Sequence, residues 1–309
     1  MKKITVTAPA TVANLACGYD LLGLAVDSPV DTISIKETDS GKIRISSIEC
    51  SDGKLPSDVD MNTAGIALAS YMKENEIDIG LDISIDKGIP LSGGMGSSAA
   101  SAVGAVFAAE KMFNKGNGMI EILSHALKAE MAVSGAGHAD NAGPCLYGGI
   151  TLVRSYSPLD IVQIPINIDI YITLVKPEIQ VRTKDARSLI PENISISTTV
   201  AQSGNLAALI HGLHVSDLDI ISNSMQDYIA EPVRSQLIPG YDKVKGAALN
   251  NRAFACNISG SGPTVFALSQ SLEDANNIGD AMVKAFADQG GVSSLMYISK
   301  INTEGPKVI

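Results

Sequence analysis

Hydrophobic and polar residues alternate over short runs in the first half of the chain, which is the period of a half-buried strand. The alternating runs cover residues 4–7, 32–38, 42–47 and 81–85. A turn signal at Asp39, Ser40 and Gly41 separates the second run from the third, so we expect these two strands to form a hairpin. Apolar residues at helical spacing predict helices over 62–75, 97–113 and 119–133. A glycine-rich loop at 134–144 and a strand at 149–153 follow.

The pattern breaks around residues 158–167, and a strand-like run at 168–175 begins a second unit. After several helical stretches the order becomes strand 253–258, strand 264–268, helix 272–288 and strand 295–301. With the leading strand, this order fits a ferredoxin-like β-α-β-β-α-β arrangement with inserted helices. We therefore expect an α+β fold with two domains, residues 1–160 and 161–309, because a chain of 309 residues exceeds the usual size of one core.

Composition and charge narrow the function classes. Hydrophobic residues make up 45% of the chain and charged residues 18%, as in a globular protein. The net charge is −10 and no basic run occurs, which argues against nucleic acid and anionic membranes as partners. The start of the chain lacks the apolar stretch of a signal peptide, and the four cysteines form no CxxC pair. We expect a cytoplasmic protein with reduced, mostly buried thiols.

The candidate chemistry centres on PLSGGMGSSAAS, residues 90–101, where a glycine-rich loop leads into an alanine-rich helix. Gly93, Gly94 and Gly96 allow a phosphate to approach main-chain N–H groups closely, and the helix dipole favours an anion there. Ser97 and Ser98 could cap the helix or reach a metal ion. The loop lacks the lysine of a P-loop, so another group must neutralise the phosphates. We predict a nucleotide triphosphate site, with a flexible linker as the alternative.

Two acidic positions follow this loop along the chain. Glu130, near the end of the third helix, could bind Mg²⁺ beside the phosphates, since Mg²⁺ prefers oxygen ligands; an exposed carboxylate beside Lys128 is the alternative. His138, Asp140 and Asn141 lie among glycine, alanine and proline, where a backbone can approach a ligand closely. Zinc fits this cluster poorly, because no second nitrogen or sulfur ligand is near.

The remaining candidates are scattered. Asn14, Gly18, Tyr19 and Asp20 follow the first strand, and Asp20 could bind an ammonium group, accept a proton or only form an Asx turn. The chain has few arginines, and three of them are candidates for binding a small acid: Arg182, Arg187 and Arg234. Two guanidiniums that converge on one cleft would bind a carboxylate or phosphate, and the alternative is that these arginines form surface ion pairs. We interpret His211 and His214 as a solvated or packed pair. The loop 259–263 is either a hairpin turn or a second element that approaches the phosphates.

Three strings resemble, in order, the motifs of the GHMP kinases. They are APATVANLACGYDLLGLA from Ala8, PLSGGMGSSAAS, and ISGSGPTVFAL from Ile258. Within that superfamily the homoserine kinase branch is the most similar, through GHADNAGPCLYGG from Gly137, VRTKDARSLIP from Val181 and EPVRSQLIPGY from Glu231. Mevalonate kinases resemble the chain less at these segments, and their pattern would imply an aspartate base at Asn141. The resemblance implies a GHMP kinase architecture with an N-terminal domain like ribosomal protein S5 domain 2 and a ferredoxin-like C-terminal domain.

The same resemblance implies ATP-dependent phosphorylation of L-homoserine to O-phospho-L-homoserine in threonine biosynthesis, with ATP and Mg²⁺ as cofactors. Ser98 and Glu130 would hold Mg²⁺. Asn141, together with Asn14, would orient the substrate hydroxyl. The expected catalytic set is therefore Ser98, Glu130 and Asn141. The nucleotide set places Asn62 near the adenine and adds the backbone of Pro90, Leu91, Ser92, Gly93, Gly94, Met95, Gly96, Ser97, Ser98, Ala99 and Ala100. The substrate set has Arg187 and Arg234 on the carboxylate and Asp20 and Asp140 near the ammonium, and also includes Asn14, His138 and Thr183.

Several alternatives stay open at this point. We expect transfer without a dedicated base, and Asp20 or Asp140 is the competing base. A non-catalytic sensor with the same fold is the rival of another class, and a mevalonate or shikimate kinase is the nearer enzyme alternative. The sequence leaves a homodimer open.

Overall fold

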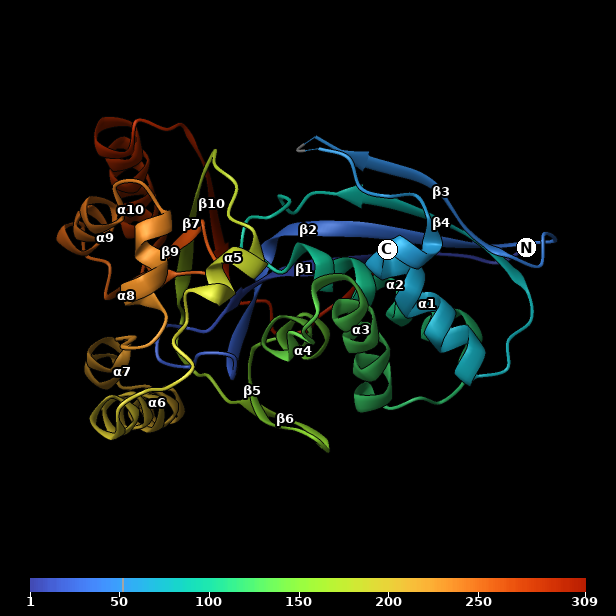
Figure 1. Ribbon diagram of the computed structural model, residues 1–309, viewed down its shortest axis with the longest axis horizontal. Helices are drawn as coiled ribbons and strands as arrows, with labels where there is room; N and C mark the ends of the chain where they lie inside the picture. Colours follow the sequence, from blue (N-terminus) through green and yellow to red (C-terminus); the bar gives the residue numbers. More distant parts are fainter. Residues whose placement is uncertain (52) are drawn as a thin grey trace.

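Two sheets organise the chain, for which a computed structural model describes residues 1–51 and 53–309 (Figure 1). The first sheet has seven strands, in the order β11-β1-β2-β4-β3 with β5 paired to β2 and β6 paired to β5. Its strands are β1 (Lys3–Ala13), β2 (Leu22–Thr38), β3 (Ile43–Cys50), β4 (Gly80–Lys87), β5 (Ile150–Tyr156), β6 (Leu159–Ile164) and β11 (Lys307–Val308). All four alternating runs of the first half are thus confirmed as strands, each longer than expected.

The expected hairpin between residues 32–38 and 42–47 is wrong. Strand β4 lies between β2 and β3, antiparallel to the first and parallel to the second. Leu81, Ile83 and Ile85 of β4 are buried and face the core, which makes β4 an interior strand. A turn after Thr38 only reverses the chain locally, whereas the hydrogen-bonding partner is decided by a strand about forty residues further on.

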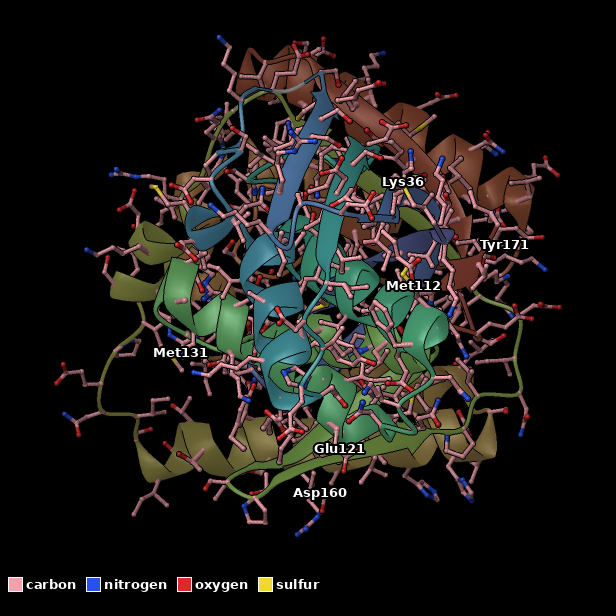
Figure 2. The ribbon with its side chains drawn as sticks, turned by 90° about the vertical axis from the view of Figure 1, so that its right-hand side faces the viewer. Lys36, Met112, Glu121, Met131, Asp160 and Tyr171 are labelled. Atoms are coloured by element: carbon pink, nitrogen blue, oxygen red, sulfur yellow. The ribbon has the colours of Figure 1, made fainter. Side chains whose placement is uncertain are left out.

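Four helices cover one face of this sheet (Figure 1). They are α1 (Thr63–Glu74), α2 (Ser97–Phe113), α3 (Met119–Ser134) and α4 (Ala139–Tyr147), with a 3₁₀ turn at Val59–Met61 before α1. The alanines of α2 let it lie close to β1 and β2, and most of its residues are buried. In Figure 2, Lys36 and Glu121 lie at the surface, whereas Met112 of α2 is buried. The first three helices confirm the expected ranges within a residue.

Helix α4 was expected to be part of a loop, and this expectation is wrong. Gly135, with φ of 78°, ends α3, and the chain turns directly into α4 with His138 as its N-cap residue. Ala139, Ala142, Cys145 and Leu146 are buried at helical spacing, so packing outweighs the low helix propensity of Gly143 and Pro144. His138, Asp140 and Asn141 are therefore held at the start of a helix.

The second sheet has the order β10-β7-β9-β8, with antiparallel neighbours throughout. Its strands are β7 (Tyr171–Pro177), β8 (Ala255–Ile258), β9 (Val265–Ser269) and β10 (Ser294–Lys300). Helix α9 (Tyr241–Asn250) precedes β8, and α10 (Leu272–Ala285), extended by a π-helical turn at Phe286–Gly290, precedes β10. This order confirms the ferredoxin-like arrangement. The inserted helices are α5 (Thr183–Ser188), α6 (Ile196–Val215), α7 (Leu218–Ser224) and α8 (Glu231–Arg234), the last followed by a 3₁₀ turn at Ser235–Leu237.

The two sheets divide the chain later than residue 160. Strand β6, which had not been expected, pairs with β5 of the first sheet and contains both residues of the expected boundary. The end of the chain also returns to the first sheet, where β11 pairs with β1 and Ile301 with Val26. We propose a boundary between Ile164 and Tyr171, with the last residues belonging to the first lobe. Within the described part of the chain, no helix is long and apolar enough to cross a membrane.

Candidate active site

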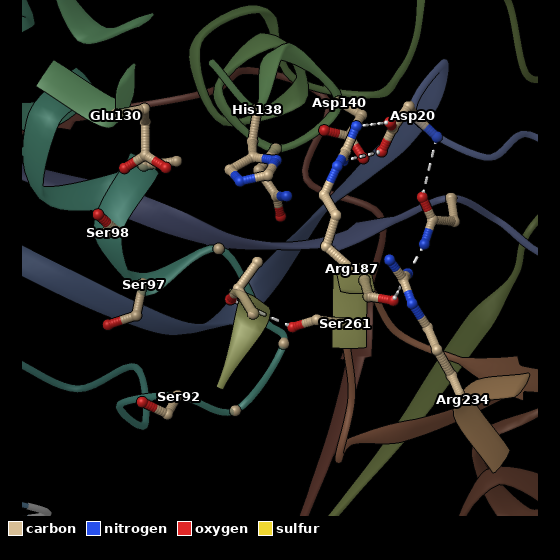
Figure 3. A pocket seen from close by; sticks show the side chains of 18 residues that line it. Asp20, Ser92, Ser97, Ser98, Glu130, His138, Asp140, Arg187, Arg234 and Ser261 are labelled. Atoms are coloured by element: carbon tan, nitrogen blue, oxygen red, sulfur yellow. Dashed lines mark hydrogen bonds and ion pairs between the residues drawn. The ribbon is translucent and has the colours of Figure 1, made fainter. Parts of the chain in front are cut away.

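A cavity of about 200 Å³ lies where the two lobes meet, and most of the expected site residues line it (Figure 3). The first lobe contributes the loop before α2, the end of α3, the start of α4 and the loop after β1, and the second lobe contributes α5, α8 and the β8–β9 loop. The expected residues that line it are Asn14, Asp20, Ser92, Gly93, Gly94, Gly96, Ser97, Ser98, Ala99, Glu130, His138, Asp140, Asn141, Thr183, Arg187 and Arg234.

The glycine-rich loop is fixed against the second lobe. Gly94 has φ of 74°, and a β-carbon there would lie 2.4 Å from the Ser259 carbonyl oxygen. The Ser259 hydroxyl donates to the Gly94 carbonyl at 2.7 Å, and the Thr264 amide donates to the Gly93 carbonyl at 3.2 Å. The loop 259–263 therefore joins β8 to β9, which confirms the turn, and it also packs against the glycine-rich loop; its approach to phosphates stays a prediction.

The start of α2 is available to an anion. Its N-cap residue is Gly96, with φ of 68°, and glycine has no side chain that could accept from the first turn. The Ser97 hydroxyl instead donates to the Ile89 carbonyl at 3.1 Å, so the expected capping by serine is wrong for this residue. Since Ser97, Ser98 and Ala99 line the cavity, the unpaired N–H groups at the helix start lie at its wall.

A second cavity, of about 440 Å³, adjoins the first and shares Ser92, Ser97 and Ser98 with it. Asn62 and Leu91 of the expected nucleotide set line it, together with apolar residues such as Pro56. Asn62 caps α1 through the Ala64 amide at 3.0 Å. The other expected nucleotide residues, Pro90, Met95 and Ala100, are buried and line neither cavity.

Sequence reasoning missed a buried lysine beneath this loop. Lys87, at the end of β4, forms an ion pair with Asp31, and both side chains are almost completely buried. The Lys87 ammonium also donates to the Ser97 carbonyl and to the Ser101 hydroxyl, both at 2.8 Å. It therefore anchors the first turn of α2. No local motif marks the pair, because Asp31 and Lys87 meet only across neighbouring strands.

Glu130 is buried at the cavity wall, only 4% exposed, so the alternative of a surface carboxylate is wrong. Lys128, its expected surface neighbour, pairs with Glu74 instead. One Glu130 carboxylate oxygen has no hydrogen-bond partner among the described residues. Burial raises the pKa of Glu130, while the Ser98 hydroxyl and Lys87 lower it. An unpaired carboxylate oxygen beside a hydroxyl is a donor set that suits a hard cation such as Mg²⁺.

Asn141 is held by a residue that the sequence analysis did not select. The Thr11 hydroxyl donates to Asn141 Oδ1 at 2.8 Å, so the amide –NH₂ is left for the cavity. The Thr11 amide also donates to the Met95 carbonyl at 3.1 Å. A β-carbon at Gly96 would lie 2.1 Å from the Thr11 hydroxyl oxygen. Thr11 thus links Asn141 to the glycine-rich loop, and its place inside the first motif is the only signal in the sequence.

Opposite charges face each other at the other end of the cavity (Figure 3). The Arg187 guanidinium donates to both carboxylate oxygens of Asp20, at 3.1 and 2.7 Å. Arg234 donates to the Gly260 carbonyl at 2.8 Å, and both guanidiniums lie near the Tyr19 ring. Burial and the negative charge of Asp20 raise the pKa of Asp140 to about 7, whereas the two arginines lower it. This end therefore offers carboxylates and guanidiniums to one small ligand.

His138 lies between the two ends of the cavity (Figure 3). Burial lowers the pKa of its imidazole, which favours the neutral ring. Its buried Nε2 has no hydrogen-bond partner within the described chain. A neutral imidazole with a free ring nitrogen can form a hydrogen bond with a hydroxyl group placed between the phosphate loop and the charged end.

The remaining candidates lie outside the cavity. Arg182 forms an ion pair with Asp185 at the surface, which is the alternative that the sequence analysis gave for the arginines. His211 and His214 are exposed, which confirms the solvated pair. The cysteines are free, and three of the four are buried. Among the described residues no group of three His, Cys, Asp or Glu side chains could hold a metal ion.

Comparisons with known proteins identify the family. The family model of the GHMP kinases N terminal domain matches residues 62–149, and the model of the GHMP kinases C terminal domain matches residues 206–288. The homoserine kinase of Chlorobium phaeobacteroides is 41% identical over the whole length of both chains. The chain belongs to the homoserine kinase family of the GHMP kinases.

Solved structures agree with this family. The crystal structure of homoserine kinase from Cytophaga hutchinsonii has a TM-score of 0.96 and 47% sequence identity, covering 100% of this chain and 98% of that one. The mevalonate kinase of Methanococcus jannaschii has a TM-score of 0.71 at 16% identity and shares the fold. The two-domain GHMP kinase fold expected from the motifs is thus confirmed.

Proposed function

We propose that the chain transfers the γ-phosphoryl group of ATP to the side-chain hydroxyl of L-homoserine, giving O-phospho-L-homoserine for threonine biosynthesis in the cytoplasm. One observation carries the substrate assignment. A cavity that joins a glycine-rich loop at one end contains two carboxylates and two guanidiniums at the other. A small zwitterion with a hydroxyl at the end of its side chain fits this order of charges.

The residues divide into three roles under this proposal. Arg187 and Arg234 bind the substrate carboxylate, and Asp20 and Asp140 bind its ammonium. The loop from Pro90 to Ala100 surrounds the triphosphate, with the adenine in the larger cavity near Asn62. Thr183 and Asn14 also line the smaller cavity, and Asn14 bonds to the Gly260 carbonyl and to the Asp20 amide at its charged end.

Mg²⁺ would be held by Glu130 and Ser98 and would neutralise charge on the phosphates. The free N–H groups at the start of α2 add to this neutralisation. Lys87, anchored by Asp31, holds the helix start in place from behind.

Asn141 and His138 orient the substrate hydroxyl, and no dedicated base is needed. The Asn141 amide cannot accept a proton, and Asp140 binds an ammonium that keeps its carboxylate charged. Phosphoryl transfer through a loose transition state depends mainly on positioning and charge neutralisation. The hydroxyl proton passes to the transferred phosphoryl group.

The test is an assay of ADP release with MgATP and a panel of acceptors: L-homoserine, L-threonine, L-serine, mevalonate, shikimate and galactose. We expect turnover with L-homoserine, and its loss in Ser98→Ala and Glu130→Ala. Turnover with another acceptor alone would refute the substrate assignment. Binding of homoserine without ADP release from any acceptor would favour a non-catalytic sensor.

A further inference from the structure

The loop after β1, residues 14–20, has an unusual backbone. Asn14, Leu15, Ala16 and Asp20 all have positive φ, at 73°, 40°, 60° and 55°. Non-glycine residues are strained in this region, and such conformations persist only where surrounding contacts impose them. The loop carries Tyr19 and Asp20, which lie at the charged end of the cavity. The contacts that impose the conformation of the loop therefore also place these two residues.

Side-chain hydrogen bonds from both lobes hold this loop. Asn14 Nδ2 donates to the Gly260 carbonyl, and the Asp20 amide donates to Asn14 Oδ1, both at 3.0 Å. The Tyr156 hydroxyl donates to the Asp20 carbonyl at 2.9 Å, and Arg187 donates to the Asp20 carboxylate. One further hydrogen bond comes from outside the cavity. Gln202 of α6, only 7% exposed, donates from Nε2 to the Cys17 carbonyl at 2.9 Å.

The same amide group reaches the segment that begins α8. Gln202 Oε1 accepts from the Tyr228 amide at 2.9 Å, and Nε2 lies 3.2 Å from Asp227 Oδ1. Asp227 in turn accepts from three successive backbone amides at 2.8–3.0 Å, those of Ile229, Ala230 and Glu231. Helix α8 starts at the last of these and ends at Arg234.

One buried amide therefore joins the two sides of the charged end. Its Nε2 donates both to the loop with Asp20 and to Asp227, and its Oε1 accepts from the segment that places Arg234. We propose that Gln202 is a positioning residue, which fixes the separation between the carboxylate of Asp20 and the guanidinium of Arg234. This inference rests on the proposed function, because that separation matters for a zwitterion that binds between them.

The test compares Gln202→Met, which keeps the length of the side chain and removes its hydrogen bonds, with Asn205→Ala. Asn205 lies on the same helix and donates to the Gln226 carbonyl at 3.2 Å, but it is only half-buried and has no hydrogen bond to the loop. For Gln202→Met we expect homoserine KM to rise by about tenfold, the effect of one hydrogen bond, with kcat and the KM for MgATP unchanged. Asn205→Ala should leave all three unchanged.

A second measurement needs no substrate. Hydrogen exchange of backbone amides in residues 14–21 should be faster in Gln202→Met than in the wild type and in Asn205→Ala. Wild-type protein without homoserine turnover would refute the proposed function, and the exchange rates would still test the positioning role. Unchanged exchange rates together with an unchanged homoserine KM would overturn the inference. A fall in kcat with an equal rise in the KM for homoserine and for MgATP would overturn it too, because it would indicate a general structural defect.

A second variant covers the case in which Gln202→Met does not fold. Gln202→Asn keeps a primary amide but shortens the side chain by one methylene, so it cannot reach the Cys17 carbonyl and the Tyr228 amide together. We expect the homoserine KM to be raised in Gln202→Asn as well, and a wild-type value would overturn the inference.

Discussion

Arg187 and Asp20, 167 residues apart in the sequence, form a two-bond ion pair across the charged end of the cavity. The pair joins the two lobes, since Asp20 follows β1 and Arg187 belongs to α5. Both side chains are partly exposed to the cavity, so a ligand can reach them. A bound zwitterion can replace this ion pair with two others, one between Arg187 and the ligand carboxylate and one between Asp20 and the ligand ammonium.

The first prediction follows from this exchange. Arg187→Gln should raise the homoserine KM by at least about tenfold, because a charged hydrogen bond to the carboxylate contributes about 1.5–3 kcal/mol. The KM for MgATP should not change. Arg182→Gln is the matched control, since Arg182 forms a similar ion pair with Asp185 at the surface and does not line the cavity. An equal effect of both substitutions would refute a specific role of Arg187.

The second prediction concerns Thr11. Thr11→Val keeps the shape of the side chain and removes the donor to Asn141 Oδ1, so the amide loses its fixed orientation. We expect kcat to fall by about tenfold or more at an unchanged homoserine KM, because the orientation matters for the reacting hydroxyl. Steady-state kinetics measure both constants.

Thr5→Val is the control for that experiment. Thr5 is on the same strand, and its hydroxyl bonds to Ser34 at 2.6 Å, away from the cavity. It removes the same kind of group with no contact to Asn141. Loss of kcat in both variants would mean that the strand, and not the orientation of Asn141, is affected.

The helices and strands with a clear period could be predicted from the sequence, and pairings between distant segments could not. The range 97–113 matches α2 because glycines precede an alanine-rich run without proline. The position of β4 between β2 and β3 depends on hydrogen bonds between strands, which leave no local signal. Helix α4 was missed because burial of its alanines outweighs glycine and proline, and burial is a property of the folded chain.

The site divides in the same way. The motifs indicated which segments carry chemistry, and the structure brings most of those residues to one cavity. Residues that hold others in place could not be found. Thr11, Lys87 and Gln202 each bond to a group far away in sequence, which for Lys87 is the carboxylate of Asp31, so only the folded structure reveals their partners.

The third prediction is a dependence of activity on pH. Burial raises the pKa of Asp140 to about 7, so this carboxyl is neutral below that pH and cannot pair with an ammonium. The value of kcat/KM for homoserine should therefore rise as the pH increases through about 7. In Asp140→Asn it should be low and lack this rise. A pH profile of the wild type that is flat from 6 to 8 would contradict the assignment.

The same pKa predicts an effect on stability with the opposite sign. A carboxyl whose pKa is higher in the folded than in the unfolded protein contributes stability at low pH, and this contribution is lost as the pH rises through the folded value. Asp140→Asn carries no charge, so it should melt at a higher temperature than the wild type above pH 7. The difference should narrow as the pH is lowered from 7 toward 4. Thermal melting at pH 5 and pH 8 measures it.

The fourth prediction uses two glycines with similar backbones. Gly94 and Gly116 have φ of 74° and 80°, but an added β-carbon meets the Ser259 carbonyl at 2.4 Å in the first case and nothing within 4 Å in the second. Gly116→Ala should cost about 1–2 kcal/mol of unfolding free energy from φ alone. Gly94→Ala should cost more and also raise the KM for MgATP, because the loop must move away from the second lobe.

Urea unfolding and the KM for MgATP separate the two effects. The difference in unfolding free energy between the variants isolates the contact of Gly94 with Ser259, because the backbone penalty is common to both. A raised KM in Gly94→Ala alone would tie nucleotide binding to the contact between the lobes. If both variants lose the same stability and keep the wild-type KM, the close approach of Gly94 to the β8–β9 loop does not fix the phosphate loop.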